Sequence, residues 1–214
     1  MRRYIVLGMM AFASLLIFVR PAISQQGGKV LLIIRDVKFP DPPILEWAIT
    51  KEAGVMREML QKAGYVVEVA SPTGESWGTP TNALKPDRKL SDVKVADYKG
   101  FVMPCLAIES TALHPDLAAV IKGAVEKGKP IAAQTGGVAV LAKAGVLSGK
   151  KYAVVGDATV PELRNGIYSG SGVVKDGKII TSGICPTMAR EFNGMQDGTP
   201  KLMEALIAEL KQTK

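Results

Sequence analysis

The sequence PIAAQTGGVAVLAKAGV, residues 130–146, combines a short buried strand, a glycine-containing turn and an alanine-rich helix. A sharp strand-to-helix turn of this kind exposes the side chain at its apex and directs backbone N–H groups toward an incoming oxyanion. Ala133, Gly136 and Gly137 supply the small residues that such a crowded backbone requires. The apex residue is Thr135, so the pattern predicts a nucleophile elbow that carries a hydroxyl.

The segments around this turn alternate between strand and helix patterns. Lys29–Arg35 (KVLLIIR) is a continuous apolar run that predicts a strand buried on both faces, and Tyr65–Ala70 predicts a second strand. Apolar residues recur about every four positions from Ile44 to Ala63, which predicts one helix ending at Gly64. Residues 71–99 are polar and are expected to form a surface excursion with little regular structure. Further strands are predicted at 101–104, 131–134 and 151–155, helices at 116–127, 136–144 and 199–211, and a hairpin at 172–182.

This alternation predicts an α/β sandwich with a mostly parallel central sheet. Ligands of such sheets bind beyond the carboxyl ends of the strands. Cys105, Thr135 and Cys185 each follow a predicted strand or its extension. We therefore expect all three side chains to lie along the same edge of the sheet.

The first 24 residues read as a secretory signal peptide. Arg2 and Arg3 form a basic start, Ile5–Val19 is an apolar run of 15 residues, and Ala22-Ile23-Ser24 suits signal peptidase. The alternative is an uncleaved membrane anchor, but the run is shorter than the roughly 20 residues of a membrane span. We expect a periplasmic or secreted protein with one domain at 25–214 and no stable membrane span after cleavage.

Charge and residue content exclude several classes of function. Removing the signal peptide lowers the formal net charge from +7 to +4, and the remaining lysines are scattered among acids. No basic run with interleaved aromatic residues is present, so we expect no nucleic-acid partner. His114 is the only histidine and neither cysteine belongs to a CxxC pair, so no metal site is predicted. The sequence has no P-loop, and we expect no bound cofactor.

Several motifs, in order, give the chain its resemblance to a known family. They are KVLLIIR at 29–35, KAGYVVEVAS at 62–71, DYKGFVMP at 97–104, the elbow, and DGKIITS at 176–182. The chain resembles the ThiJ/PfpI family of the class I glutamine amidotransferase-like superfamily over nearly all of residues 29–210. The resemblance implies a flavodoxin-like three-layer sandwich and a homodimer, and it places a cysteine nucleophile where this chain has Thr135.

The resemblance also assigns roles to residues around the elbow. The family has a glutamate that hydrogen-bonds the nucleophile, twelve residues before the glycine that ends the first helix, and this position is Glu52. The alternative is an ordinary solvated helix glutamate. The family's Gly-Gly after Pro104 is replaced by Cys105 and Leu106. The backbone N–H groups of Leu106 and Gly136 would then form the oxyanion hole.

Family chemistry is in question at two points. The partner histidine of the family falls near Val154 or Val155, so no imidazole is available there. A threonine hydroxyl needs an adjacent base to act as a nucleophile. The resemblance also places Cys185 and Pro186 at the rim of the pocket. Cys105 and Cys185 would then form either a structural disulfide or a reactive thiol pair beside Thr135.

Other residues near the predicted pocket each have a functional and a structural interpretation. Trp47 and Trp77 could roof the pocket, or they could pack in the core or at its rim. Arg190 and Glu191 follow the Cys185 loop at the expected start of a helix, where they would bind a substrate carboxylate or form a surface ion pair. The methionines, among them Met56 and Met59, are expected to fill the core.

Three functions remain open from the sequence. The first is an exported, catalytically silent member that binds a small molecule or protects other proteins through a Glu52–Thr135–Cys105 pocket. The second is a hydrolase, glyoxalase or deglycase acting on small carbonyl or amide compounds through Cys105, Cys185 or Thr135. The third is a thiol redox sensor that uses the two cysteines.

Overall fold

The computed structural model describes residues 27–34, 42–78, 82–105, 112–155 and 160–212, so the predicted signal peptide lies outside it. The strands are β1 (Lys29–Ile33), β2 (Val66–Ser71), β3 (Trp77–Gly78), β4 (Ala83–Leu84), β5 (Arg88–Lys89), β6 (Tyr98–Met103), β7 (Ile131–Gln134), β8 (Lys151–Tyr152), β9 (Ile167–Tyr168), β10 (Val173–Asp176) and β11 (Ile179–Ser182). The helices are α1 (Pro42–Trp47), η1 (Ala48–Ala53), α2 (Gly54–Lys62), η2 (Leu90–Asp92), η3 (Val95–Asp97), α3 (Pro115–Glu126), α4 (Gly136–Lys143), η5 (Pro161–Asn165), α5 (Pro186–Glu191) and α6 (Thr199–Gln212).

The central sheet has seven strands in the order β10-β11-β7-β6-β1-β2-β5. Every neighbouring pair is parallel except β10 and β11, which form the predicted antiparallel hairpin. The predicted α/β sandwich with a mostly parallel sheet is therefore confirmed.

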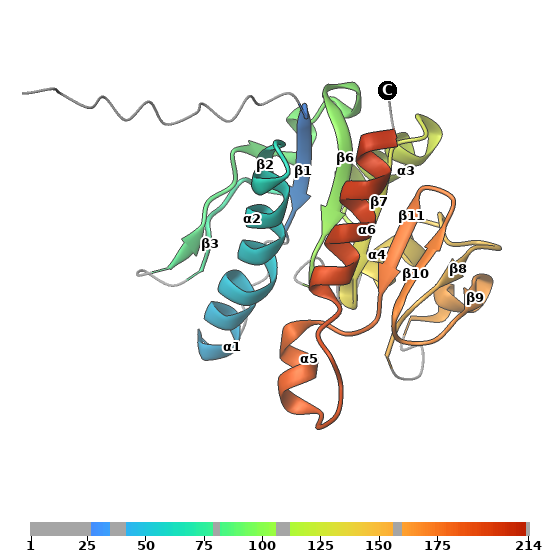
Figure 1. The fold of residues 1–214 in the computed structure, drawn as a ribbon. Helices are drawn as coiled ribbons and strands as arrows, with labels where there is room; N and C mark the ends of the chain where they lie inside the picture. Colours follow the sequence, from blue (N-terminus) through green and yellow to red (C-terminus); the bar gives the residue numbers. More distant parts are fainter. Residues whose placement is uncertain (1–26, 35–41, 79–81, 106–111, 156–159, 213–214) are drawn as a thin grey trace, which may run out of the picture.

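Helices cover both faces of this sheet. Along β1, Val30 and Leu32 pack into the core cluster that includes Met56 and Leu206, whereas Leu31 packs into the opposite cluster. The first cluster lies under α1, α2 and α6, which Figure 1 shows together on one face, and the second lies under α3 and α4. The side chains of β1 are buried on both faces because each face has its own helical layer.

Three expectations about the elements need correction. The single helix expected from Ile44 to Ala63 is divided by a π-helical stretch, η1, between α1 and α2. The polar segment 71–99 contains three short strands and two 3₁₀ turns, and β5 joins the edge of the central sheet. The strand expected at 151–155 ends at Tyr152 and pairs with β9 outside the central sheet. Beyond Tyr152, the N–H of Ala153 points toward β11 and donates to the Thr181 hydroxyl (2.9 Å), while the N–H of Val154 donates to the carbonyl of Gly170 (3.1 Å).

The topology brings three distant segments to one edge. β6, β7 and β11 are adjacent and parallel, so their carboxyl ends lie side by side. Cys105, Thr135 and Cys185 follow these strands, as expected. Among the described residues, no helix has the length and apolar character needed to cross a membrane.

Candidate functional site

Thr135 forms the apex of a strained turn between β7 and α4. Its backbone has φ 47° and ψ −101°, and it is the only described non-glycine residue with positive φ. This region is unfavourable for a β-branched residue, and strained residues gather at functional sites. The turn is fixed by a hydrogen bond from the Thr135 N–H to the Ser182 carbonyl (2.8 Å) and another from the Val138 N–H to the Thr135 carbonyl (3.0 Å). The predicted elbow geometry is present.

Gly137 allows the elbow helix to approach β6. A Cβ atom at this position would lie 2.8 Å from the carbonyl oxygen of Met103 and 3.2 Å from that of Pro104. Both distances are shorter than ordinary contacts, so a larger residue would push α4 away from the end of β6. Gly137 therefore keeps the elbow next to Cys105.

Glu52 lies inside the site and not on a solvated helix face. It is 1% exposed, and its Oε1 atom accepts a hydrogen bond from the backbone N–H of Cys105 (2.7 Å). Burial, followed by the nearby negative charge of Cys185, raises the pKa of this carboxyl well above its usual range. Oε2 has no hydrogen-bond partner among the described residues. Burial thus favours the protonated form of Glu52.

The π-helical stretch η1 directs Glu52 inward. The N–H of Gly54 bonds to the carbonyl of Ile49, five residues earlier, which adds a residue to this helical turn. A Cβ on Gly54 would lie 2.9 Å from the same carbonyl oxygen, so glycine permits the wide turn. Such turns often occur at functional sites.

Cys105 and Cys185 are both free in the structure, and their side chains interact directly. Cys185 precedes α5 as its N-cap residue and is 1% exposed, whereas Cys105 is partly exposed. Cys185 and Pro186 are both buried, and their expected position at the rim of the pocket stays a prediction. The disulfide between Cys105 and Cys185 stays a prediction.

The two thiols have opposite shifts in pKa. A hydrogen bond from Cys105 is the main cause that lowers the pKa of Cys185 to about 6. Three further groups lower the pKa of Cys185: the N–H groups of Thr187 and Met188 at the start of α5, and the Thr135 hydroxyl. None of them forms a hydrogen bond of regular geometry with the Cys185 sulfur. The same interaction, followed by burial, raises the pKa of Cys105. Cys185 is therefore the more acidic of the two thiols.

Gly136 contributes the expected backbone donor, but its N–H interacts with the Cys105 sulfur, where it opposes the rise in pKa of this thiol. Thr135 Oγ1 is buried and has no partner of regular geometry among the described residues. The elbow therefore contributes groups that interact with the sulfurs of Cys105 and Cys185. No described residue is placed to take a proton from the Thr135 hydroxyl.

Gln134 is a site residue that the sequence analysis missed. Its side chain is fully buried, donates to the carbonyl of Ile184 (2.6 Å) and accepts from the hydroxyl of Thr199 (3.0 Å). Gln134 directly precedes Thr135, so these bonds connect the elbow to the loop before Cys185 and to the start of α6. A polar residue at the end of the otherwise apolar strand IAAQ was the signal that could have identified it.

The remaining expected residues lie elsewhere or outside the described part. Leu106 and the Trp77 side chain are outside it. His114 caps α3 by accepting from the N–H of Asp116 (3.3 Å). Arg190 and Glu191 end α5, where they were expected to begin a helix. Met56 is buried and Met59 packs against the same core, as predicted.

Metal-binding groups and cavities are the alternatives to this site in the described part of the chain. Among these residues, no group of three or more His, Cys, Asp or Glu side chains is placed to hold a metal ion. A cavity of about 230 Å³ borders the Cys185 loop at Ile184 and Lys201, but Glu52, Cys105, Thr135 and Cys185 are not among its lining residues. The chemistry of the site therefore rests on two thiols, a buried carboxyl with a raised pKa and a hydroxyl.

The model of the DJ-1/PfpI family matches residues 47–195, which include Glu52, Cys105, Thr135 and Cys185. The chain belongs to the DJ-1/PfpI family. The ThiJ/PfpI resemblance of the sequence is thereby confirmed.

Relatives extend this family assignment. The uncharacterized protein MJ0967 of Methanocaldococcus jannaschii is 30% identical over 175 residues, 79% of this chain and 80% of that protein. The crystal structure of a ThiJ/PfpI domain protein from Brachyspira murdochii has a TM-score of 0.67 at 17% identity, covers 89% of this chain and 99% of that chain, and shows the likeness of fold alone. Drosophila melanogaster DJ-1beta has a TM-score of 0.58 at 26% identity, with 86% and 96% covered.

Proposed function

We propose that this DJ-1/PfpI protein is a dithiol redox protein in which Cys185 is the reactive thiolate and Cys105 its partner. The feature that supports this most is the interaction between the two thiols, which lowers the pKa of Cys185 to about 6 and raises that of Cys105. The thiolate is the nucleophile in thiol–disulfide exchange, so Cys185 is largely in its reactive form at pH 7.

The reaction proceeds in two balanced steps. The Cys185 thiolate attacks one sulfur of a small disulfide RSSR, forms a mixed disulfide and releases RS⁻. The Cys105 thiol then loses its proton to solvent and attacks the Cys185 sulfur, which closes the Cys105–Cys185 disulfide and releases a second RS⁻. The protein is oxidised by two electrons and the small disulfide is reduced to two thiolates. Because Cys185 is 1% exposed, the substrate is a small molecule and not a protein disulfide.

The elbow is degenerate in this proposal. Thr135 has no imidazole beside it, because the only histidine, His114, caps α3, and the raised pKa of Glu52 favours a proton donor over a base. Thr135 then serves as a backbone support and a hydroxyl donor to the Cys185 thiolate. Its replacement by alanine is expected to slow thiol exchange only modestly.

We also propose that the chain is exported, as its N-terminal sequence predicts. Export would place the dithiol in an oxidising compartment, where the disulfide form is common and small disulfides are available. The intact mass of the exported protein tests this: a chain beginning at Gln25 is expected, and a chain retaining residues 1–24 would contradict it.

A second candidate is an enzyme in which the Cys185 thiolate attacks a small carbonyl compound. The low pKa of Cys185 favours it equally, because a thiolate is also a good carbon nucleophile. The two candidates differ in their need for Cys105. A carbonyl reaction survives Cys105→Ala in part, whereas dithiol oxidation requires both sulfurs.

The main test is thiol titration of the reduced protein against an alkylating reagent and against oxidised glutathione. The chain has only two cysteines, so Cys105→Ala reports on Cys185 alone and Cys185→Ala on Cys105 alone. We expect wild-type protein to alkylate with a midpoint near pH 6 and to lose two hydrogens in mass on oxidation. Cys105→Ala should instead stop at a mixed disulfide. A midpoint near pH 9 in the wild type, or a wild-type protein that also stops at the mixed disulfide, would contradict the proposal.

A further inference from the structure

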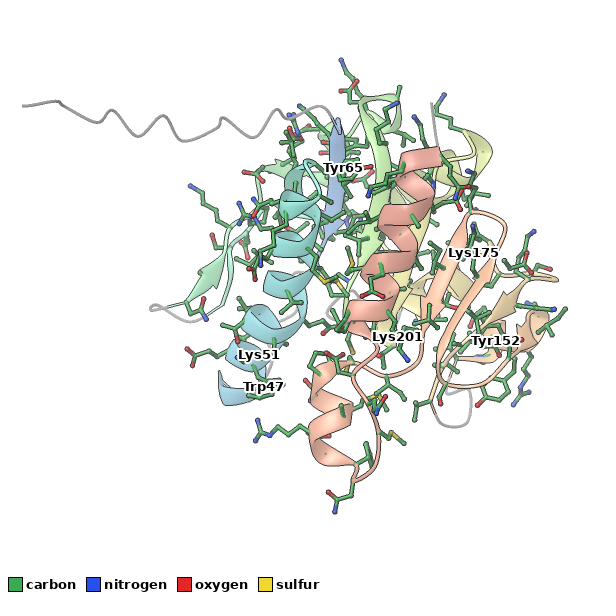
Figure 2. The ribbon with its side chains drawn as sticks, in the orientation of Figure 1. Trp47, Lys51, Tyr65, Tyr152, Lys175 and Lys201 are labelled. Atoms are coloured by element: carbon green, nitrogen blue, oxygen red, sulfur yellow. The ribbon has the colours of Figure 1, made fainter. Side chains whose placement is uncertain are left out.

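Two cations flank the ring of Trp47 at the junction of α1, η1 and α5. The guanidinium carbon of Arg190 lies 5.2 Å from the ring centroid, and the Nζ atom of Lys51 lies 5.7 Å from it. Both are within the range of cation–π attraction. Figure 2 labels Trp47 and Lys51 together at the lower end of this helical stretch, next to α5.

Within the described part of the chain, the donors of these three side chains have no hydrogen-bond or ion-pair acceptor. The Trp47 Nε1 atom is fully buried and has no hydrogen-bond partner among the described residues. No ion pair formed within the described part of the chain includes Arg190 or Lys51, and Glu191 is not paired with Arg190. Buried N–H groups in native structures nearly always find an acceptor, so the missing one is informative.

The same elements carry the chemistry of the dithiol site. Glu52 follows Lys51 in η1, and Cys185 is the N-cap of the short helix that ends near Arg190. α5 packs against η1, so the donors and the thiols belong to one helical junction. A ligand held by the donors would therefore lie close to the elements that enclose Cys185.

We propose that Trp47, Lys51 and Arg190 form a binding site for a small oxyanion, a carboxylate or a phosphate. The guanidinium of Arg190 can bind two oxygens of such a group at once, and the ammonium of Lys51 adds a positive charge. The indole N–H of Trp47 is a hydrogen-bond donor that still needs an acceptor. Only the statement that this anion is part of the substrate rests on the proposed dithiol function. The substrate would then be a small disulfide that carries an anionic group.

The binding test uses the fluorescence of Trp47 in the full mature chain. The protein has two tryptophans, so Trp77→Phe leaves Trp47 as the only reporter. We expect a saturable change on titration with inorganic phosphate or acetate, at an ionic strength held constant with sodium chloride. The anion with the lower dissociation constant identifies the preferred oxyanion. If Trp77→Phe fails to fold, the rise in Tm of wild-type protein with each anion replaces the signal.

Charge variants establish where the anion binds. Arg190→Gln is expected to weaken binding about tenfold, in line with the loss of one charge-assisted contact, and Arg190→Lys to restore part of it. The matched control is Lys122→Gln, which removes an exposed cation from α3 on the other face of the sheet. The proposal is overturned if neither anion gives a saturable change, or if Arg190→Gln and Lys122→Gln behave alike.

A second experiment separates this site from the dithiol function. Oxidation of the reduced protein is compared for dithiodipropionate and its uncharged diamide. We expect the carboxylate disulfide to react faster, and Arg190→Gln to lower the ratio of the two rates about tenfold while Lys122→Gln leaves the ratio unchanged. If neither disulfide reacts, the dithiol proposal fails. Anion binding is then still decided by the fluorescence titration of Trp47. Equal rates for both would refute the anionic substrate alone.

Discussion

Thr135 has the strained backbone of a nucleophile elbow, and it places a hydroxyl at the apex of the turn. Its φ of 47° is unfavourable for a residue with a branched Cβ, and each such strained residue costs about 1–3 kcal/mol. The turn keeps this conformation because hydrogen bonds to Ser182 and from Val138 fix both sides of the residue. A strained turn of this kind is expected where the backbone positions a functional site. Here it lies beside the sulfurs of Cys105 and Cys185.

Replacing Thr135 tests whether this strain is present. Glycine adopts positive φ without a steric penalty, whereas alanine keeps the Cβ atom that causes it. We expect Thr135→Gly to be more stable to urea than Thr135→Ala by about 1 kcal/mol. An alanine variant as stable as the glycine variant would show that the turn is relaxed in solution.

Glu52 makes the stability of the protein depend on pH in an unusual direction. Its pKa is raised in the folded protein, so the folded state keeps a proton that the unfolded chain releases above pH 4.5. Stability from this group is therefore complete below about pH 4.5 and falls as pH rises toward the folded pKa. Most carboxylates in folded proteins have the opposite effect, because their pKa is lowered.

Glu52→Gln should remove this dependence. The Gln carbonyl can accept the same hydrogen bond from the N–H of Cys105, and it has no proton to lose. We expect the variant to gain stability relative to wild type above pH 4.5, by at most about 1.4 kcal/mol per pH unit. Urea unfolding from pH 4 to 8 measures the difference, and Glu58→Gln on the exposed face of α2 is the control for removal of a carboxylate. A constant difference across this range would mean that Glu52 is ionised in the folded state.

At the scale of the elements, the strands were easier to predict than the connections between them. β1 is an apolar run whose hydrophobicity marks burial on both faces, and β2 and β7 are short segments rich in apolar residues, so the sequence alone predicts all three closely. η1 was not predictable from the spacing of apolar residues, because a π-turn changes the helix by a single residue. β8 and β9 also escaped prediction, since their pairing depends on contacts between distant segments.

For the site residues, too, positions that follow strands were predictable, and contacts between distant segments were not. Thr135, Cys105 and Cys185 were placed correctly at one edge, because carboxyl ends of parallel strands coincide. The partnership of the two thiols and the burial of Cys185 could not be predicted, as both depend on how α5 packs against η1. Gln134 was missed because its partners, Ile184 and Thr199, lie at least 50 residues away in the chain.

Gln134 is expected to hold the elbow, the Cys185 loop and α6 in register. Gln134→Ala would leave the Ile184 carbonyl and the Thr199 hydroxyl without this partner and create a small cavity, for a loss of about 3 kcal/mol. It should also raise the pKa of Cys185, because the loop would no longer hold the thiolate against its donors. Urea unfolding and the pH profile of alkylation measure the two effects, with exposed Gln61→Ala as control. Loss of stability with an unchanged pH profile would limit Gln134 to a structural role.

For the whole molecule, the two thiols connect parts of the chain that are distant in sequence. Cys105 follows β6 and Cys185 precedes α5, with β7, α4 and the β10–β11 hairpin between them. The sheet order brings these segments together by placing β7 between β6 and β11. A disulfide here would close a loop of about 80 residues and restrict the unfolded chain strongly.

Oxidation should therefore stabilise the fold. Loop closure of this length contributes about 4–5 kcal/mol in the chain-entropy model, and loss of the thiolate hydrogen bond in the reduced state offsets part of it. By linkage, any net gain lowers the reduction potential of the folded pair relative to the unfolded chain, by about 30 mV for each 1.4 kcal/mol. We expect a higher Tm for oxidised than for reduced protein, and a more negative potential in native buffer than in urea, both measured against dithiothreitol redox buffers. The Cys105→Ala/Cys185→Ala variant should show no redox dependence. An oxidised protein that melts below the reduced one would mean that the bond strains the site, in which case reduction releases strain and the pair acts as an oxidant toward small thiols.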